Sequence, residues 1–135
     1  MTDTECIFCK IVAGQIPSFK LFENDHVFAF LDIAPFEKGH VLLVPKHHAA
    51  YLTDLPEPVL EHLMPAAKCV ATLLLARLPC DGFNILQNNG RCATQVIPHV
   101  HFHIIPRWNG RAVNWISGNY DSPDEIADLH RRLTV

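Results

Sequence analysis

The stretch His99-Val100-His101-Phe102-His103-Ile104-Ile105-Pro106 is the most informative in the chain, because it alternates histidine with apolar residues. Successive side chains of a β-strand point to opposite faces, so a strand here would place His99, His101 and His103 on one face. In a helix the same three histidines would be spread around the axis. The spacing therefore predicts a strand with three imidazoles on one face, where each needs a metal, a phosphate or a hydrogen-bond partner. A solvated face rich in histidine is the simpler alternative, but the polar loop before the stretch favours a functional site.

The chain of 135 residues has the composition of one globular domain, with 49% hydrophobic and 19% charged residues. Its net charge of −3 does not favour nucleic-acid binding by a broad basic face. The N-terminus lacks the features of a signal peptide, and no apolar run approaches the roughly 20 residues that span a bilayer. We therefore expect a cytoplasmic protein without a nucleic-acid or membrane partner. Five cysteines without an export signal favour thiols or metal ligands over disulfides.

Hydrophobic periodicity predicts short strands at 19–23, 26–31, 40–45 and 83–87, in addition to the histidine-rich strand. Asn24-Asp25 predicts a tight turn between the first two strands. Apolar residues at helical spacing predict one long helix over 58–78, with a kink if Pro65 lies inside it. Short helices are predicted near residues 7–12 and after Ser122-Pro123.

Other parts of the chain carry potential ligands whose roles the local sequence leaves open. Cys6 and Cys9 form a C-x2-C pair, which serves redox chemistry after a strand or metal binding with two further ligands. His48 leaves the third strand and is either a ligand or a solvated loop residue. Asp32, at the end of the second strand, is either a ribose ligand or a turn residue. Amides and glycine in the loop 88–95 are typical of anion sites.

With these segments in place, the chain resembles the histidine triad (HIT) family of nucleotide hydrolases and transferases. The family's motif His-φ-His-φ-His-φ-φ, where φ is apolar, is complete at 99–105. The other matching segments, in the family's order, are Cys6-Ile7-Phe8-Cys9-Lys10-Ile11, Phe30-Leu31-Asp32-Ile33, Val44-Pro45-Lys46-His47-His48, Asn88-Asn89-Gly90 and Gln95. The resemblance covers residues 6–107 and is greatest to the Hint-like and bacterial branches. We expect one HIT domain over 1–135, with a core at 6–107 and a C-terminal tail at 108–135.

The resemblance implies an α+β fold with a five-stranded antiparallel sheet, one long helix and a short C-terminal helix. It also implies a homodimer whose sheets join into ten strands. The expected substrate is a purine nucleotide or nucleoside phosphoramidate, attacked at its α-phosphorus. By position, His101 is the nucleophile that forms a covalent nucleotidyl-histidine, which water then hydrolyses. His103 contacts the phosphate oxygens, and the backbone carbonyl of His99 accepts a hydrogen bond from Nδ1 of His101.

The resemblance also implies roles for the residues around the three histidines. Asp32 takes the ribose hydroxyls, and Asn88 and Gln95 hold the phosphate, the ribose side or the bridging atom. The remaining nucleotide contacts are apolar: Ile7, Phe8, Ile11, Phe30, Ile33 and Val96. Ile11 and Ile33 suit the protein core equally well. A structural Zn²⁺ ion would be held by Cys6, Cys9, His48 and His99, a Cys2His2 set suited to tetrahedral zinc.

Two positions depart from the family's pattern. The loop before the triad commonly reads Ala-Gly-Gln, and Thr94 stands here in place of the glycine, where it is expected to resist positive φ. Relatives often carry a serine after the glutamine to assist the leaving group, but Val96 has no proton to supply. Two alternatives to a phosphoramidase therefore remain open. One is a hydrolase or transferase of dinucleoside polyphosphates or nucleotide sugars, and the other is a zinc-stabilised nucleotide-binding adaptor with low turnover.

Overall fold

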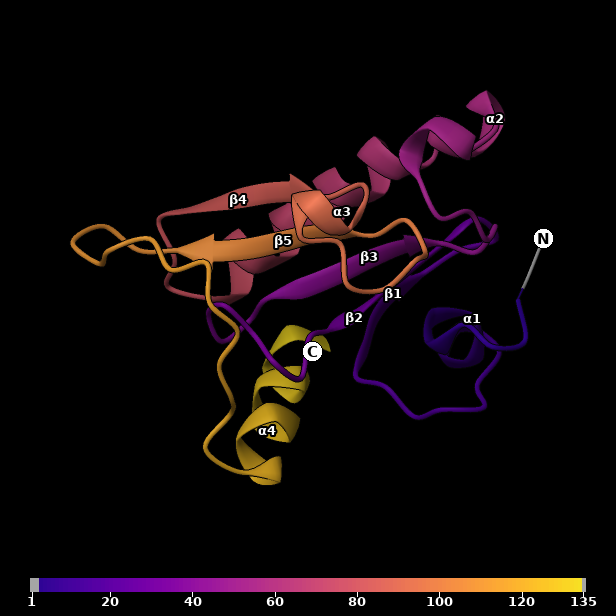
Figure 1. Ribbon diagram of the computed structural model, residues 1–135. Helices are drawn as coiled ribbons and strands as arrows, with labels where there is room; N and C mark the ends of the chain where they lie inside the picture. Colours follow the sequence, from indigo (N-terminus) through magenta and orange to yellow (C-terminus); the bar gives the residue numbers. More distant parts are fainter. Residues whose placement is uncertain (1–2, 135) are drawn as a thin grey trace.

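The fold is described by a computed structural model that covers residues 3–134 (Figure 1). Residues 1, 2 and 135, at the ends of the expected domain, lie outside the described range. The elements in chain order are α1 (Ile7–Val12), β1 (Lys20–Glu23), β2 (Val27–Leu31), β3 (Val41–Pro45), the 3-10 turn η1 (Leu52–Asp54), α2 (Glu57–Leu60), α3 (Leu63–Arg77), β4 (Gly82–Gln87), the 3-10 turn η2 (Arg91–Ala93), β5 (Phe102–Arg107) and α4 (Pro123–Thr134).

Within the described residues, the strands form a five-stranded sheet in the order β1-β2-β3-β5-β4, with every pair antiparallel. This order places β5, which carries the end of the histidine stretch, between β3 and β4. His103 lies opposite Leu42 of β3 and opposite Leu86 of β4. The predicted α+β fold with a five-stranded antiparallel sheet is therefore confirmed.

The two faces of the sheet bury different apolar clusters. On one face, Leu43 and Ile104 pack against Val70 and Leu74 of α3, which Figure 1 shows running behind β5. On the other face, strand residues pack against Phe8 and Ile11 of α1; they are Phe28, Phe30, Leu42 and Val44. Because side chains alternate along a strand, His103 lies on this second face, the face of α1.

The predicted long helix is divided into α2 and α3 by a turn at Glu61 and His62. Proline has no N–H, and its ring clashes with the carbonyl four residues earlier, which for Pro65 is that of Glu61. The helix therefore breaks before Pro65 instead of kinking at it. Pro65 lies in the first turn of α3, where backbone N–H groups have no helical partner in any case.

The segment Glu57–Arg77 is long and apolar enough to cross a membrane, by length and composition alone. This corrects the expectation that no apolar run reaches such a length. In the folded chain the segment is interrupted at 61–62, and Leu63, Ala67 and Leu74 are buried in the main core cluster. Its apolar character is therefore explained by packing against the sheet.

The histidine stretch is only partly a strand, because β5 begins at Phe102. His103 lies in the ladder, whereas His99 and His101 precede it. The partner strand β3 ends at Pro45, and proline has no N–H to continue the ladder. The N–H of Val100 instead donates to the carbonyl of Ala49 at 2.8 Å. The prediction of one strand carrying all three imidazoles was therefore wrong at its N-terminal end.

Candidate functional site

The imidazole of His101 is held in one tautomer by its own backbone segment. Its Nδ1 lies 2.7 Å from the carbonyl oxygen of His99 and donates a hydrogen bond to it. The lone pair of the neutral ring is then at Nε2. The ring packs edge-on against Phe8, with centroids 5.1 Å apart. Burial lowers the pKa of His101, so the neutral, nucleophilic form is favoured.

His40, to which the sequence interpretation gave no role, is hydrogen-bonded to His103. Its Nδ1 accepts a hydrogen bond from the backbone N–H of Phe36 at 3.0 Å, so its own hydrogen is on Nε2. That Nε2 lies 2.9 Å from Nδ1 of His103 and donates to it. His103 therefore carries its hydrogen on Nε2. The sequence feature that could have identified His40 is its place at the start of an apolar strand. A buried imidazole there needs a hydrogen-bond partner.

Burial keeps both of these histidines neutral near pH 7. It is the largest cause that lowers the pKa of His40 to about 3 and the pKa of His103 to about 4. The rings of His101 and His103 have centroids 4.9 Å apart. The site thus combines an unprotonated Nε2 on His101 with an N–H donor on Nε2 of His103. A nucleophile beside a donor suits attack on an anionic electrophile such as a phosphoryl group.

Asp32 lies beside these histidines at the end of β2. One carboxylate oxygen accepts a hydrogen bond from the backbone N–H of Ala34 at 2.9 Å, and the other lies 3.7 Å from Nε2 of His40. Burial raises the pKa of Asp32 above its usual value. The carboxylate is close enough to the histidines to serve the same ligand, and its role as a ribose acceptor stays a prediction.

The apolar residues expected to contact the nucleotide occupy three different environments. Phe8 packs edge-on against Phe30 at 5.7 Å and also contacts His101, so Phe8 links Phe30 to this histidine. Ile11 is buried in the core cluster under α1. The remaining three are exposed: Ile7 by 43%, Ile33 by 73% and Val96 by 85%. Ile33 is therefore not a core residue.

Gln95 uses its side-chain amide to fix the loop before the histidine stretch. Its Oε1 accepts from the N–H of Gly90 at 2.7 Å, and its Nε2 donates to the carbonyls of Ala50 and Ile97. Both amide hydrogens thus contact backbone carbonyls. The role expected for Gln95, to hold the phosphate, the ribose side or the bridging atom, stays a prediction. The phosphate role of Asn88, which is half-buried at the start of this loop, stays a prediction.

Thr94 adopts φ of +68°, the left-handed conformation that we expected threonine to resist. It is the one non-glycine residue with positive φ between residues 3 and 134. The conformation closes the turn η2, in which the N–H of Thr94 donates to the carbonyl of Arg91 and that of Gln95 to Gly90. A β-branched residue in this region costs about 1–2 kcal/mol. The hydrogen bonds of the turn therefore hold Thr94 in a conformation that glycine would adopt without this cost.

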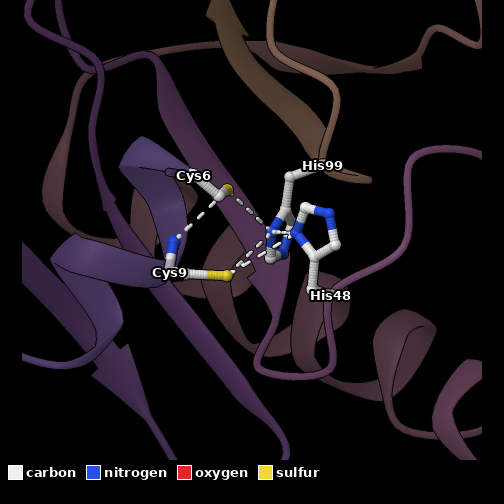
Figure 2. A group of neighbouring side chains, drawn as sticks. All are labelled: Cys6, Cys9, His48 and His99. Carbon is white, nitrogen blue, oxygen red and sulfur yellow. Dashed lines mark hydrogen bonds between the residues drawn. The ribbon is translucent and has the colours of Figure 1, made fainter. Parts of the chain in front are cut away.

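A second cluster gathers the four predicted metal ligands from three parts of the chain. Figure 2 shows Cys6, the N-cap of α1, and Cys9 of α1 converging with His48 and His99. The Cys6 sulfur is 3.3 Å from Nδ1 of His99, the Cys9 sulfur is 3.6 Å from Nδ1 of His48, and the two Nδ1 atoms are 3.0 Å apart. Tetrahedral zinc bonds imply about 3.6 Å between sulfur and nitrogen and about 3.3 Å between two nitrogens. The donor set therefore fits a tetrahedral metal ion.

The contacts of Nε2 in His48 and His99 favour the tautomer with hydrogen on Nε2, which leaves Nδ1 free to bind a metal. Nε2 of His99 donates to the carbonyl of Pro45 at 2.9 Å, and Nε2 of His48 lies 3.6 Å from the carboxylate of Asp3. Both lone pairs on Nδ1 then point at the cysteine sulfurs, as in sites where outer-shell partners orient histidine ligands. His99 thus contributes its side chain to this cluster and its carbonyl to His101.

Comparison with known proteins assigns the chain to a family. Residues 13–110 match the HIT domain. Over 134 residues the chain is 45% identical to adenosine 5'-monophosphoramidase HNT1 of Saccharomyces cerevisiae, covering 97% of this chain and 82% of that protein. It is 46% identical over 132 residues to adenosine 5'-monophosphoramidase hnt1 of Schizosaccharomyces pombe, covering 96% of both. The chain therefore belongs to the HIT family.

A solved structure shows the same fold. The crystal structure of a Zn-bound histidine triad family protein from Mycobacterium smegmatis matches with a TM-score of 0.84 at 33% identity. The match covers 96% of this chain and 92% of that one. The resemblance inferred from the histidine motif is therefore confirmed by both kinds of comparison.

Proposed function

We propose that this HIT-family hydrolase cleaves the P–N bond of adenosine 5'-monophosphoramidate and related purine nucleoside phosphoramidates. The complementary tautomers of His101 and His103 support the proposal, because an unprotonated Nε2 of His101 could act as nucleophile beside the N–H donor of His103. Two yeast relatives that match nearly the whole chain are adenosine 5'-monophosphoramidases. The tautomers favour an enzyme over the adaptor alternative, because they suit catalysis. The names of the relatives favour phosphoramidates over dinucleotides as the substrate class.

The proposed reaction has two displacements at the α-phosphorus. Nε2 of His101 bonds to phosphorus as the P–N bond of the substrate breaks, and the departing amine takes a proton from solvent. Water then forms a bond to phosphorus, the bond to His101 breaks, and one water proton returns to solvent. Nε2–H of His103 donates to a phosphoryl oxygen, whose negative charge it stabilises. Asp32 and Asn88 are proposed to hold the ribose and the phosphate.

Turnover and trapping of the intermediate test this proposal. The protein is incubated with adenosine 5'-monophosphoramidate, AMP release is followed, and acid-quenched samples are analysed by intact mass. We expect AMP formation and an adenylate-sized adduct, both abolished by His101→Ala. His130→Ala, a histidine change on α4, is the matched control and is expected to keep both. Tight AMP binding without adduct or turnover would show an adaptor. Faster cleavage of a dinucleoside polyphosphate would overturn the assigned substrate class.

We also propose that the Cys2His2 cluster binds a structural Zn²⁺ ion, supported by the ligand distances and by the Zn-bound relative. The ion would tie α1 to the segment before β5, and so support Phe8 and the His99 carbonyl against His101. Metal analysis of untagged protein is expected to give one zinc per chain. Cys6→Ser is expected to lose zinc and about 3 kcal/mol of stability, whereas exposed Cys69→Ser keeps both. Metal-free wild-type protein of unchanged stability would exclude the site.

The open edge of the sheet supports a homodimer. The edge strand β1 is covered by α4, from which Nε2 of His130 donates to the carbonyl of Lys20 at 2.6 Å. The other edge strand, β4, exposes Phe83 by 37% and Ile85 by 44%. Unpaired apolar edges invite pairing with another strand. We therefore propose that two β4 strands pair, which joins the two sheets into ten strands.

A further inference from the structure

The segment 108–122 between β5 and α4, called the strap below, turns back over the loop 33–40 that joins β2 to β3 (Figure 1). The side-chain amide of Asn114 donates to the carbonyl of Phe36 at 2.8 Å. The hydroxyl of Tyr120 accepts a hydrogen bond from the N–H of Gly39 at 3.0 Å. The N–H of Gly118 donates to the carbonyl of Pro35 at 2.8 Å. The strap therefore holds the backbone of Pro35, Phe36 and Gly39 by direct hydrogen bonds.

Ion pairs join the same two segments at their outer surface. Arg111 of the strap pairs with Glu37 of the loop at 2.9 Å. Lys38 of the loop pairs with Asp121 at 3.0 Å and with Glu125 of α4 at 2.9 Å. These charged side chains are mostly exposed, so each ion pair contributes little to the stability of the contact between strap and loop. The hydrogen bonds of Asn114, Gly118 and Tyr120 are the contacts of this interface with the loop backbone, and those of Asn114 and Tyr120 are made by side chains.

The loop that the strap holds is the one that orients the histidines. The N–H of Phe36 donates to Nδ1 of His40, and the ring of Phe36 stacks on His103 with centroids 5.7 Å apart and an angle of 9°. The peptide groups of Phe36 are thus fixed on both sides, since its N–H contacts His40 and its carbonyl contacts Asn114. Gly39, which Tyr120 holds, directly precedes His40.

The strap is also anchored on the sheet beside this loop. The ring of Trp115 packs edge-on against Phe36 at 6.2 Å, and the guanidinium of Arg107 lies 4.7 Å from the Trp115 ring centroid. Nε of Arg107 donates to Asn84 of β4 at 2.8 Å. Among the described residues, Nη1 and Nη2 of Arg107 are buried without a hydrogen-bond partner. The cation–π contact with Trp115 and the nearby negative charge of Glu37 both compensate for the buried guanidinium nitrogens.

We propose that Asn114 and Tyr120 are positioning residues for the reaction assigned to His101 and His103. By holding the peptide groups of Phe36 and Gly39, they keep the donation from His40 to His103, which leaves the hydrogen of His103 on Nε2, toward the phosphate. The catalytic part of this inference rests on the proposed phosphoramidase function. Its structural part, that the strap sets the tautomer of His103, stands without that function.

Asn114→Ala and Tyr120→Phe test the inference, because each removes one contact to the loop. We expect a kcat lower by about two- to ten-fold for each, the loss typical of one hydrogen bond, with KM little changed. Nitrogen-15 NMR of the histidine rings, on the same full-length proteins, is expected to show a mixture of His103 tautomers in place of the single Nε2–H form. This spectroscopic change would not follow from a merely structural strap.

Asn109→Ala is the matched control, because Asn109 lies on the strap and its hydrogen bond to the described residue Asp81 is donated by its backbone N–H, which the substitution keeps. It is expected to leave kcat and the ring spectra unchanged. Variants that unfold would be recognised by circular dichroism, and Asn114→Gln, which keeps an amide, is expected to recover part of the loss. Wild-type kcat and wild-type His103 spectra in both strap variants would overturn the inference. If the wild-type protein itself lacks turnover, the function fails while the spectra still decide the role of the strap.

Discussion

At the scale of single residues, the site depends on which ring nitrogen carries each hydrogen. The carbonyl of His99 sets His101, and the N–H of Phe36 sets His103 through His40. A neutral imidazole needs one such partner to choose its tautomer. The first contact is local in sequence and was expected. The second joins residues 63 positions apart and required the fold.

Thr94 is the residue whose backbone conformation, with positive φ, is least suited to its β-branched side chain. Thr94→Gly removes the steric cost of positive φ but increases the entropy of the unfolded chain, so we expect a net gain of about 0.5–1 kcal/mol. Urea denaturation measures the change. The matched control is Thr72→Gly on the exposed side of α3, which is expected to destabilise the protein because glycine is a poor helix former. A loss at both positions would show that Thr94 is not strained.

At the scale of elements, the proposed dimer depends on the edge strand β4. Its exposed residues alternate along the strand, with Phe83 and Ile85 on the face of the sheet that α3 covers. Antiparallel strands alternate their faces, so a second β4 would place its own apolar residues beside these. The sequence predicts this strand well, but not that it lies at an edge, because strand order depends on contacts between distant segments.

Ile85→Lys places a charge on this edge and is expected to convert a dimer into a monomer. Size-exclusion chromatography with light scattering, over a hundredfold range of concentration, measures the mass. Ile7→Lys is the matched control, because Ile7 on α1 is exposed to nearly the same extent, 43% against 44%. It is expected to remain dimeric. A wild-type protein that is monomeric throughout, or a dimeric Ile85→Lys variant, would contradict the proposed pairing.

At the scale of the whole molecule, folding requires the histidines of the site to stay neutral. Burial lowers the pKa of His40 to about 3 and that of His103 to about 4, whereas an unfolded histidine titrates near about 6.5. Between these values the unfolded chain binds more protons than the folded chain. The free energy of unfolding therefore falls as the pH falls through about 6.5. The raised pKa of Asp32 acts in the opposite direction at lower pH.

His40→Gln tests this effect, because it removes one of the titrating groups. Between pH 7 and pH 5, each depressed histidine is expected to cost about 2 kcal/mol of stability. The wild-type protein should therefore lose about 2 kcal/mol more than His40→Gln over this interval, measured by urea denaturation at each pH. The metal cluster and Asp32 are present in both proteins and affect both alike. Parallel losses in the two proteins would show that His40 is not forced to stay neutral.

The sequence by itself determined the elements and the family, because these depend on local patterns. The period of two predicts the histidine-rich strand, and the cap with proline at Ser122-Pro123 predicts α4. The helical spacing predicts a helix over 58–78, which the structure divides at 61–62. The histidine motif and its companion segments were enough to identify the HIT family, and they named all four residues that gather in the Cys2His2 cluster.

Only the tertiary structure decided which contacts hold these residues in place. The end of β3 at Pro45 releases His99 from the ladder, so its side chain turns to Cys6, 93 positions away. The antiparallel packing of β3 on β5 places His40 on His103, and the strap fixes the loop between β2 and β3. Such contacts join distant segments whose meeting depends on strand order, register and loop path. No local pattern carries that information, whereas the folded backbone does.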